Sequence, residues 1–268
     1  MNGFDHGDAG RSIARFLGLT MREFGPVEAG TARLVGTAPA AASVRSADGG
    51  IAMGALLTLA DSIGGLAGGL AALPGWVVST NLMLRAVDRH AIGPLGLKSH
   101  VVRAGKNATV TEICITDTGN ADALVATGTL TSAVLQPEGG PPVYERPLVL
   151  SAPDVDPATM PHLTEFLGAT ASAPSQLSLV ITDELRNPWG ILHGGVTAAL
   201  VDLAGCHATG RAATTDTVLH YLSPGRVGPV TATASAHGER ADGTLVRVEV
   251  RDRGAADRLM AVAVTTVQ

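Results

Sequence analysis

Two long apolar stretches dominate the hydrophobic pattern of the chain. The first runs from Ile51 to Leu73, the second begins at Val196, and each directly follows a glycine-rich turn. Neither stretch carries the regular polar positions that mark the exposed face of a surface helix. The pattern therefore predicts a buried helix in each half of the chain, and Pro74-Gly75 ends the first of them.

Segments in which polar and apolar residues alternate surround the first apolar stretch. Such alternation is typical of β-strands with one buried face. A short amphipathic segment over residues 11–18, which ends at a glycine, precedes them and predicts a helix. The predicted strands cover residues 19–24, 31–38, 77–87, 95–103, 109–117 and 123–135. The expected order is a short helix, two strands, the long helix and about four strands.

The second half of the chain repeats this plan. Asp61 in the first apolar stretch corresponds to Asp202 in the second, 141 positions later, and the glycines around them align without a gap. Beyond the helix the correspondence continues at a separation of 135, where Asp117 matches Asp252. Recurrence of turns, helix and strands in one order indicates an internal duplication.

A proline-rich segment separates the two copies. Residues 136–161 hold seven of the 15 prolines and show no periodic pattern, which predicts an ordered, extended linker. The expected organisation is therefore a first domain over residues 1–135, the linker over 136–161 and a second domain over 162–268.

Composition limits the classes of function that fit. Apolar residues make up 46% of the 268 residues, and the net charge of −5 with no basic run argues against nucleic-acid binding. The first apolar stretch is long enough to cross a bilayer, but its glycines, its central Asp61 and its lack of basic flanks favour a helix buried in a domain. Two cysteines indicate a reducing compartment, and the N-terminus lacks the features of a signal peptide. We therefore expect a cytoplasmic protein without a nucleic-acid or membrane partner.

The turn before the second helix carries the candidate chemistry. A carboxylate in so apolar a helix is costly unless it is hydrogen-bonded, so Asp202 needs a structural partner or a function. The start of a helix presents unpaired N–H groups and a positive dipole end, which suits a polarised carbonyl oxygen. Gly194 and Asp202 are eight residues apart, which is about 12 Å along one helix, so one reacting atom cannot contact both. If both serve one reaction, the helix start of one half must act with the carboxylate of the other.

Residues 187–202 resemble the motif of a known family. An asparagine, a glycine-bearing turn and a His-Gly-Gly run lead into a helix with an aspartate, as in the PaaI-like and 4-hydroxybenzoyl-CoA-type acyl-CoA thioesterases. The resemblance covers both halves and implies an α+β double hotdog, in which two fused units each have a long central helix wrapped by a curved antiparallel sheet. In that family two units share a site. The glycine N–H at the helix start and the asparagine polarise the thioester carbonyl, and the helix carboxylate of the other unit acts as nucleophile or as base for water.

Carried over to this chain, the resemblance implies one complete site and one degraded site. Asn187, His193 and Gly194 match the polarising side, and both Asp61 and Asp202 match the carboxylate. In the first half, however, Ser46, Ala52 and Met53 stand where the second half has asparagine, histidine and glycine. Asp61 paired with the second turn is therefore expected to be competent, and Asp202 paired with the first turn is not.

Further residues have assignments from the resemblance or from their position. Gly195 is expected beside the substrate. Ser79 follows Asp61 by 18 residues, where some relatives place a hydroxyl that orients water, although a hydroxyl at a strand edge is the alternative. Arg103 and Lys106 flank a hairpin that lies near the CoA phosphates in relatives, and a solvated turn is the alternative. His193 fits three roles, which are helix capping, support of the turn and proton transfer.

Two residues of the second half complete the expectations. His220 occupies the spacing after Asp202 that Ser79 has after Asp61, which weakens any rule about that hydroxyl. Cys206 lies one helical turn after Asp202, and with no activating base nearby in the sequence we expect a buried structural thiol rather than a nucleophile.

The sequence thus predicts an acyl-CoA thioesterase with no metal and no cofactor beyond the CoA of its substrate, assembled as a dimer or trimer of chains. Serine-hydrolase, nucleotide-hydrolase and zinc-enzyme motifs are absent from the sequence. A non-catalytic acyl-CoA binder or sensor is one alternative. A hotdog hydratase or dehydratase is another, although the spacing of His193 and Asp202 does not fit that chemistry. The acyl group has no signature in the sequence.

Overall fold

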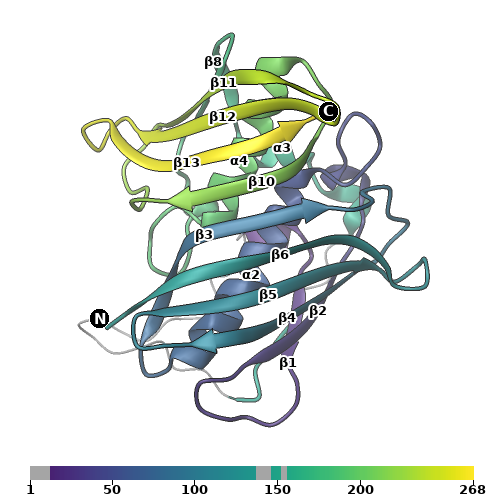
Figure 1. Ribbon diagram of the computed structural model, residues 1–268, viewed down its shortest axis with the longest axis vertical. Helices are drawn as coiled ribbons and strands as arrows, with labels where there is room; N and C mark the ends of the chain where they lie inside the picture. Colours follow the sequence, from purple (N-terminus) through teal and green to yellow (C-terminus); the bar gives the residue numbers. More distant parts are fainter. Residues whose placement is uncertain (1–12, 137–145, 152–155) are drawn as a thin grey trace.

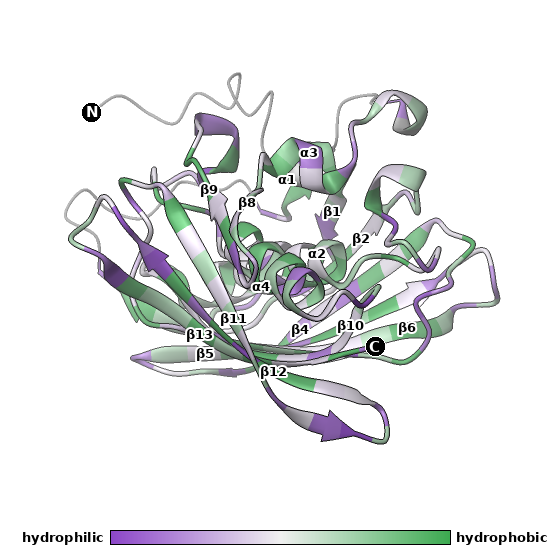
Figure 2. Ribbon diagram, turned by 90° about the horizontal axis from the view of Figure 1, so that it is seen from above, coloured by the Kyte–Doolittle hydropathy of each residue, from purple (hydrophilic) through white to green (hydrophobic). Residues whose placement is uncertain are grey.

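A curved antiparallel sheet wrapped around two long helices forms the framework of the protein (Figures 1 and 2). The computed structural model describes residues 13–136, 146–151 and 156–268. Within these residues thirteen strands join in the order β7-β1-β2-β4-β5-β6-β3-β10-β13-β12-β11-β9-β8. Helices α2 (Met53–Ala72) and α4 (Gly194–Thr209) pack against each other on the concave side of the sheet.

The first half follows the predicted order of elements. Each described strand end lies within about two residues of its predicted position, so the alternation pattern located the strands correctly. The linker adds a short edge strand, β7, which pairs with β1, while residues 137–145 and 152–155 lie outside the described part of the chain. Besides α2, the elements are α1 (Ile13–Phe16), β1 (Thr20–Glu23), β2 (Arg33–Ala38), η2 (Ala42–Val44), β3 (Trp76–Ala86), β4 (Leu95–Ala104), β5 (Ala108–Asp117), β6 (Ala123–Leu135) and β7 (Val149–Leu150).

The second half has the same succession of elements. Its helix α4 has 16 residues, against 20 in α2. Besides α4, the elements are η3 (Pro157–Thr159), α3 (Leu163–Leu167), β8 (Thr170–Ala173), β9 (Gln176–Leu179), η4 (Asp183–Leu185), β10 (Thr214–Tyr221), β11 (Val230–Arg240), β12 (Gly243–Asp252) and β13 (Arg258–Val267).

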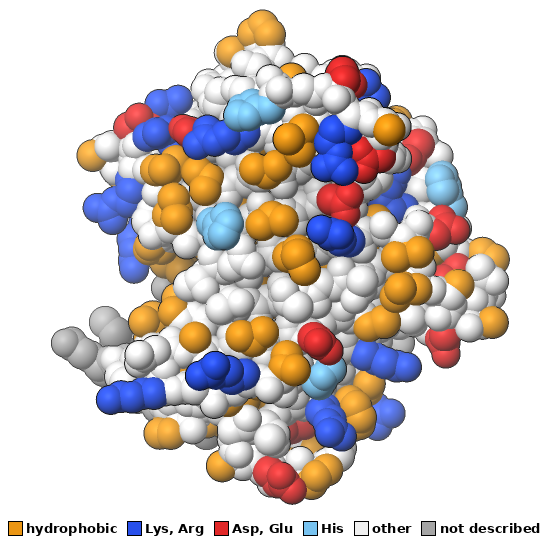
Figure 3. Space-filling model, in the orientation of Figure 1, with side chains coloured by type: hydrophobic (Ala, Val, Ile, Leu, Met, Phe, Trp, Pro, Cys, Tyr) orange, Lys and Arg blue, Asp and Glu red, His pale blue; other side chains and the backbone are white. Residues whose placement is uncertain are grey.

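Strands β3 and β10 join the two halves into one sheet. They run antiparallel, with Leu82 opposite Leu219 and Met83 opposite Val218. Leu82 and Leu219 are buried against the helices, whereas Val218 faces outward. On the outer face of the sheet, charged and hydrophobic side chains are interspersed (Figure 3).

Glycines allow α2 and α4 to cross at close range. A Cβ on Gly195 would lie 2.7 Å from Cα of Thr58, and a Cβ on Gly54 would lie 3.0 Å from Cα of Ala199. The Thr58 hydroxyl donates to the carbonyl oxygens of Gly54 at 2.7 Å and Gly195 at 2.9 Å. The glycine at the start of each helix therefore lies against the middle of the other helix.

The short helices of the two halves contact each other. Phe16 of α1 and Phe166 of α3 stack with ring centroids 4.1 Å apart, and both helices lie above α2 and α4 (Figure 2). Helix α2 is long and apolar enough to cross a membrane by length and composition, but most of its apolar window is buried inside the protein. This burial is what the sequence pattern predicted for a core helix.

Candidate active site

Asp61 lies where α2 meets the start of α4. Its side chain is only 6% exposed, yet both carboxylate oxygens have donors. The Gly195 N–H donates to Oδ2 at 2.8 Å, and the Ser79 hydroxyl, on β3, donates to Oδ1 at 2.7 Å. The aspartate of the first half thus faces the helix start of the second half, which is the pairing expected if the two groups serve one reaction. The N–H of Gly195, expected beside the substrate, is already used by Asp61.

Gly194 lies against the same carboxylate. A Cβ on this residue would lie 2.7 Å from Oδ2 of Asp61, so the close approach requires glycine. Gly194 is the first residue of α4, and its N–H has no hydrogen-bond partner within the described part of the chain. A free N–H at the positive end of a helix, beside a carboxylate, is suited to hold the oxygen of a polarised carbonyl group.

His193 caps helix α4. Its Nδ1 accepts from the Gly195 N–H at 3.0 Å and lies 3.4 Å from Oδ2 of Asp61. Burial lowers the pKa of the imidazole, although the negative charge of Asp61 opposes this effect. The ring is therefore neutral at neutral pH, and because Nδ1 is an acceptor, its proton is on Nε2. Of the three roles considered for His193, helix capping is the one that the structure shows.

Asn187 shapes the turn that precedes His193. Its Oδ1 accepts from the N–H groups of Trp189 at 3.0 Å and Ile191 at 3.3 Å. This leaves its Nδ2 amide as the group that can donate to a ligand, since no described residue accepts from it. The Trp189 ring lies 3.7 Å, centroid to centroid, from the ring of Trp76 at the start of β3. The two tryptophans of the chain therefore meet beside this turn.

Tyr221, at the end of β10, was not singled out from the sequence. Its hydroxyl donates to the carbonyl oxygen of Gly194 at 3.1 Å. Burial and the nearby charge of Asp61 both raise the pKa of this phenol. The residue 135 positions earlier is Ala86. A comparison of the two halves could therefore have singled out Tyr221, because the equivalent position of the first half has no hydroxyl.

The second carboxylate, Asp202, has the same kind of backbone contact as Asp61, which we call a backbone cradle: it accepts from the N–H of the second residue of the other helix. Asp202 accepts from the Gly54 N–H at 2.7 Å and from the Thr214 hydroxyl at 2.6 Å, and it is 3% exposed. Burial raises the pKa of Asp202, against the lowering effects of these hydrogen bonds and of Arg89. The Cys206 thiol lies 3.8 Å from Oδ1 of Asp202, and burial raises its pKa as well, so this thiol is not activated.

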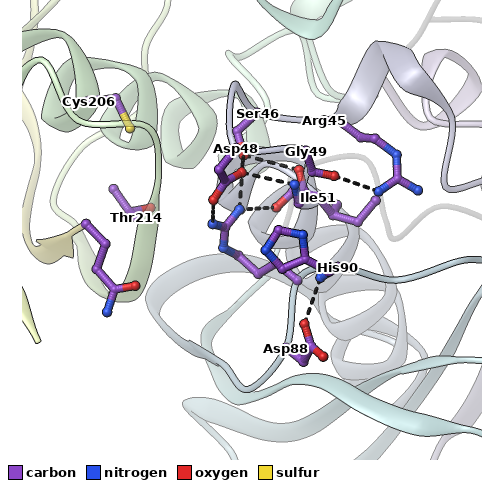
Figure 4. Close-up of polar contacts among 12 residues, drawn as sticks. Arg45, Ser46, Asp48, Gly49, Ile51, Asp88, His90, Cys206 and Thr214 are labelled. Atoms are coloured by element: carbon purple, nitrogen blue, oxygen red, sulfur yellow. Dashed lines mark hydrogen bonds and ion pairs between the residues drawn. The ribbon is translucent and has the colours of Figure 1, made fainter.

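The turn of the first half is filled by its own polar contacts (Figure 4). The Ser46 hydroxyl donates to Asp48 at 2.7 Å and accepts from the buried Arg89 guanidinium at 3.0 Å. The guanidinium also pairs with Asp48 and donates to the carbonyl oxygen of Ile51 at 2.9 Å. Ser46, which stands in place of Asn187, is thus committed to this cluster and is not directed at Asp202.

The hydroxyl that serves Asp202 is Thr214, and the expected equivalence of His220 with Ser79 is wrong. In the second half four positions are lost from the helix and two between its end and the hydroxyl-bearing residue, so the separation of equivalent residues falls from 141 to 135 and Ser79 matches Thr214. Sheet register agrees, because Ser79 lies opposite Ser132 and Thr214 opposite Val267. His220 instead approaches the side chain of Asn81 at 3.2 Å.

Arg103 and Lys106 lie apart from these contacts. Both are exposed on the hairpin between β4 and β5, which is beside the C-terminal part of α2, where Thr109 approaches Gly68. No contact joins either side chain to Asp61 or to the turn before α4 in the described residues. The same residues contain no group of three or more histidine, cysteine, aspartate or glutamate side chains placed to hold a metal ion.

Comparison with known proteins relates the chain to others through its fold. No family model matches the sequence, and neither does any curated protein. An acyl-ACP thioesterase from Bacteroides thetaiotaomicron matches with a TM-score of 0.56 and 11% identity, over 87% of this chain and 98% of that one. A 12:0-ACP thioesterase from Umbellularia californica matches with a TM-score of 0.55 and 12% identity, over 93% and 94%. The chain therefore has a hotdog-like fold, a large antiparallel sheet around central helices, that is shared with thioesterases.

Proposed function

We propose that this protein hydrolyses an acyl-CoA thioester to the free acid and CoA at a single site formed by Asp61 and the start of α4. We interpret the two halves as tandem hotdog units, whose helices supply opposite sides of the site. The observation that carries the proposal is the position of the Asp61 carboxylate against Gly194, whose N–H is free to bind an oxygen. The shared fold with thioesterases supports the same chemistry.

In the proposed reaction the thioester carbonyl oxygen accepts a hydrogen bond from Gly194 N–H, with Asn187 Nδ2 as a second donor. These donors stabilise the negative charge that develops on the oxygen as the carbonyl carbon becomes tetrahedral. Asp61 either attacks that carbon directly or takes a proton from the attacking water, and Ser79 orients its Oδ1. The carbon–sulfur bond then breaks, and the CoA thiolate takes up a proton. If Asp61 attacks, water then hydrolyses the mixed anhydride formed with its carboxylate, which frees Asp61 and supplies the hydroxyl of the acid. If Asp61 acts as base, the attacking water supplies that hydroxyl directly. In both routes the remaining proton of the water passes from Asp61 to the thiolate.

Asymmetry between the turns supports a single site. Met53 stands in place of Gly194, and the Ser46 hydroxyl is held by Asp48 and Arg89. Asp202 therefore accepts a backbone N–H as Asp61 does, but the described residues offer no side-chain donor for a carbonyl oxygen beside it. We assign Asp202 a structural role.

The remaining features of the proposal follow from composition and from the family resemblance. The protein is proposed to act in the cytoplasm, without a metal or a cofactor other than the CoA of its substrate, as a homo-oligomer. Arg103 and Lys106 are proposed contacts for the CoA phosphates. The two structural neighbours are named for acyl-ACP substrates, so the carrier of the acyl group is a specific point to test.

The test is a thiol-release assay with acetyl-, medium-chain, long-chain and aryl-CoA esters, and with acyl-ACP of matching chains. We expect release from CoA esters, and a fall of at least about 100-fold in kcat for Asp61→Asn. The background reaction of Cys114 and Cys206 with the thiol reagent is measured with enzyme alone.

Asp202→Asn is the matched control, because it makes the same change in the equivalent cradle. It should leave kcat within about threefold of the wild-type value. Equal losses in the two variants would overturn the single-site proposal. Release from ACP but not CoA esters would overturn the assigned carrier, and release from neither would overturn hydrolysis and favour a binding protein.

A further inference from the structure

Tyr221 is connected to Asp61 through a single peptide group. Its hydroxyl donates to the carbonyl oxygen of Gly194 at 3.1 Å. The N–H of that same peptide group belongs to Gly195 and donates to Oδ2 of Asp61 at 2.8 Å. The first peptide of α4 is therefore held at its oxygen by Tyr221 and at its hydrogen by the carboxylate.

Such a chain of hydrogen bonds has two physical effects. A donor on the carbonyl oxygen polarises the peptide group and makes its N–H a stronger donor to the carboxylate. It also holds the plane of the peptide group that follows Gly194 Cα, and so limits the backbone rotation at Gly194 that would turn the Gly194 N–H, which has no partner in the described part of the chain. Both effects act on groups that the proposed reaction uses.

The tyrosine hydroxyl remains a donor at neutral pH. Burial and the charge of Asp61 raise the pKa of Tyr221, so the phenol keeps its proton. Among the described residues, the titratable side chains that face Asp61 are His193, from the turn before α4, and Tyr221, from β10. His193 is neutral at neutral pH because burial lowers its pKa.

The first half shows that the fold does not need this hydroxyl to bring an N–H to a carboxylate. Gly54 donates to Asp202 at 2.7 Å, although the counterpart of Tyr221 is Ala86, which has no hydroxyl. Tyr221 is thus one of the differences between the copies, like His193 in place of Ala52, and these differences lie around Asp61.

We propose that Tyr221 is a positioning residue of the candidate site, which holds the Gly194–Gly195 peptide so that Gly195 N–H binds Asp61 and Gly194 N–H is directed at the substrate oxygen. The effect of Tyr221 on catalysis rests on the proposed hydrolysis. The link from Tyr221 through the peptide group to Asp61 is independent of that proposal.

Tyr221→Phe removes the hydroxyl and keeps the ring. Loss of one neutral hydrogen bond that acts through the peptide predicts a fall in kcat of about 3- to 10-fold, with KM within about twofold. The ¹⁵N–¹H signal of the Gly195 amide, observed in protein labelled with ¹⁵N-glycine, should move upfield because its bond to the carboxylate weakens.

Thr217→Val is the matched control. It removes another buried hydroxyl from β10, one that pairs with Thr265 at 3.0 Å, and should change neither kcat nor the Gly195 amide signal, even if it lowers the melting temperature. A Tyr221→Phe variant with wild-type kcat and an unmoved Gly195 signal would overturn the proposal. If the wild-type protein hydrolyses no thioester, the proposed function fails, and the amide signal alone then decides whether Tyr221 controls this peptide.

Discussion

The backbone nitrogen of Gly195 lies 2.8 Å from a carboxylate oxygen of Asp61, although 134 positions separate the two residues. The contact exists because α2 and α4 cross at glycines, which places the first turn of each helix against the middle of the other. Gly54 and Asp202 repeat the contact at 2.7 Å. Asp61 and Asp202 therefore accept the same kind of backbone hydrogen bond, and they differ in the side chains that surround each carboxylate.

Gly194→Ala should abolish most of the proposed activity. Its Cβ would lie 2.7 Å from Oδ2 of Asp61, so the carboxylate must move away from the helix start. Misplacement on this scale predicts a fall in kcat of about 100-fold, as measured by steady-state thiol release. Gly205→Ala is the control on the same helix, because its Cβ would meet only side-chain methyl groups at 3.3 Å or more. Wild-type kcat in Gly194→Ala would contradict the assigned geometry.

Ser79 and Thr214 make equivalent contacts that should have different consequences. Ser79→Ala removes a hydrogen bond to the Asp61 carboxylate, and a bond to a charged group is worth about 1.5–3 kcal/mol. We therefore expect kcat to fall about 10- to 100-fold, measured in the same thiol-release assay.

Thr214→Val is the isosteric counterpart at Asp202. It should lower the free energy of unfolding by about 1–3 kcal/mol, because a buried carboxylate loses a donor, and it should leave kcat unchanged. Denaturant unfolding and the activity assay together separate the two effects. A loss of activity in Thr214→Val that exceeds the loss in Ser79→Ala would contradict the proposal, because it would place the reaction at Asp202 rather than at Asp61.

The strands could be located from the sequence because their polar and apolar residues alternate with a fixed period, and the two core helices because each long apolar stretch follows a glycine-rich turn. The eight-residue separation of Gly194 and Asp202 predicted that a helix start and a carboxylate that serve one reaction come from opposite halves, and Asp61 does lie against the start of α4. Contacts that depend on strand register could not be located in this way. The shorter α4 changes the separation of equivalent residues, which is why Thr214 rather than His220 serves Asp202. Likewise Arg89 reaches the first turn from a loop that no local pattern connects to it.

The linker is anchored by a buried ion pair that should make stability depend on acid pH. The Arg146 guanidinium binds both oxygens of Glu23, and the Leu148 N–H donates to Oε2 at 3.2 Å. These hydrogen bonds, the one from Arg146 first, hold the pKa of Glu23 below its usual range. The stabilisation is therefore complete above the ordinary glutamate pKa of about 4.3 and is lost as the pH falls through the lower value of the folded state.

Glu23→Gln should consequently lower the free energy of unfolding at pH 7 by about 1–3 kcal/mol, and the difference from wild type should shrink at pH 3. Urea unfolding at both pH values measures it. Glu28→Gln, an exposed change in the following loop, is the control and should have no effect at either pH. A difference that stays constant between pH 7 and pH 3 would show that the charge of Glu23 contributes nothing.

Asp202 should have the opposite effect on the pH dependence of stability. Burial raises its pKa, so the folded chain holds this proton more tightly than the unfolded chain does. Its contribution is fully present below about 3.9, the ordinary aspartate pKa, and is lost as the pH rises through the raised value in the folded state. At neutral pH the protein therefore bears the cost of a buried charge.

Asp202→Asn removes that charge and keeps the hydrogen bonds, since an amide oxygen can accept from Gly54 N–H and an amide N–H can donate to the Thr214 oxygen. We expect an increase of about 1 kcal/mol in the free energy of unfolding at pH 7, seen as a rise of about 2–4 °C in Tm. Tm should also fall less between pH 4 and pH 7 than in the wild type. Asp216→Asn is the control, because its carboxylate is half exposed and only 3.8 Å from Arg85, a surface pair of little net energy. A fall in Tm for Asp202→Asn would mean that the ionised carboxylate, rather than its hydrogen-bonding shape, is what the crossing of α2 and α4 requires.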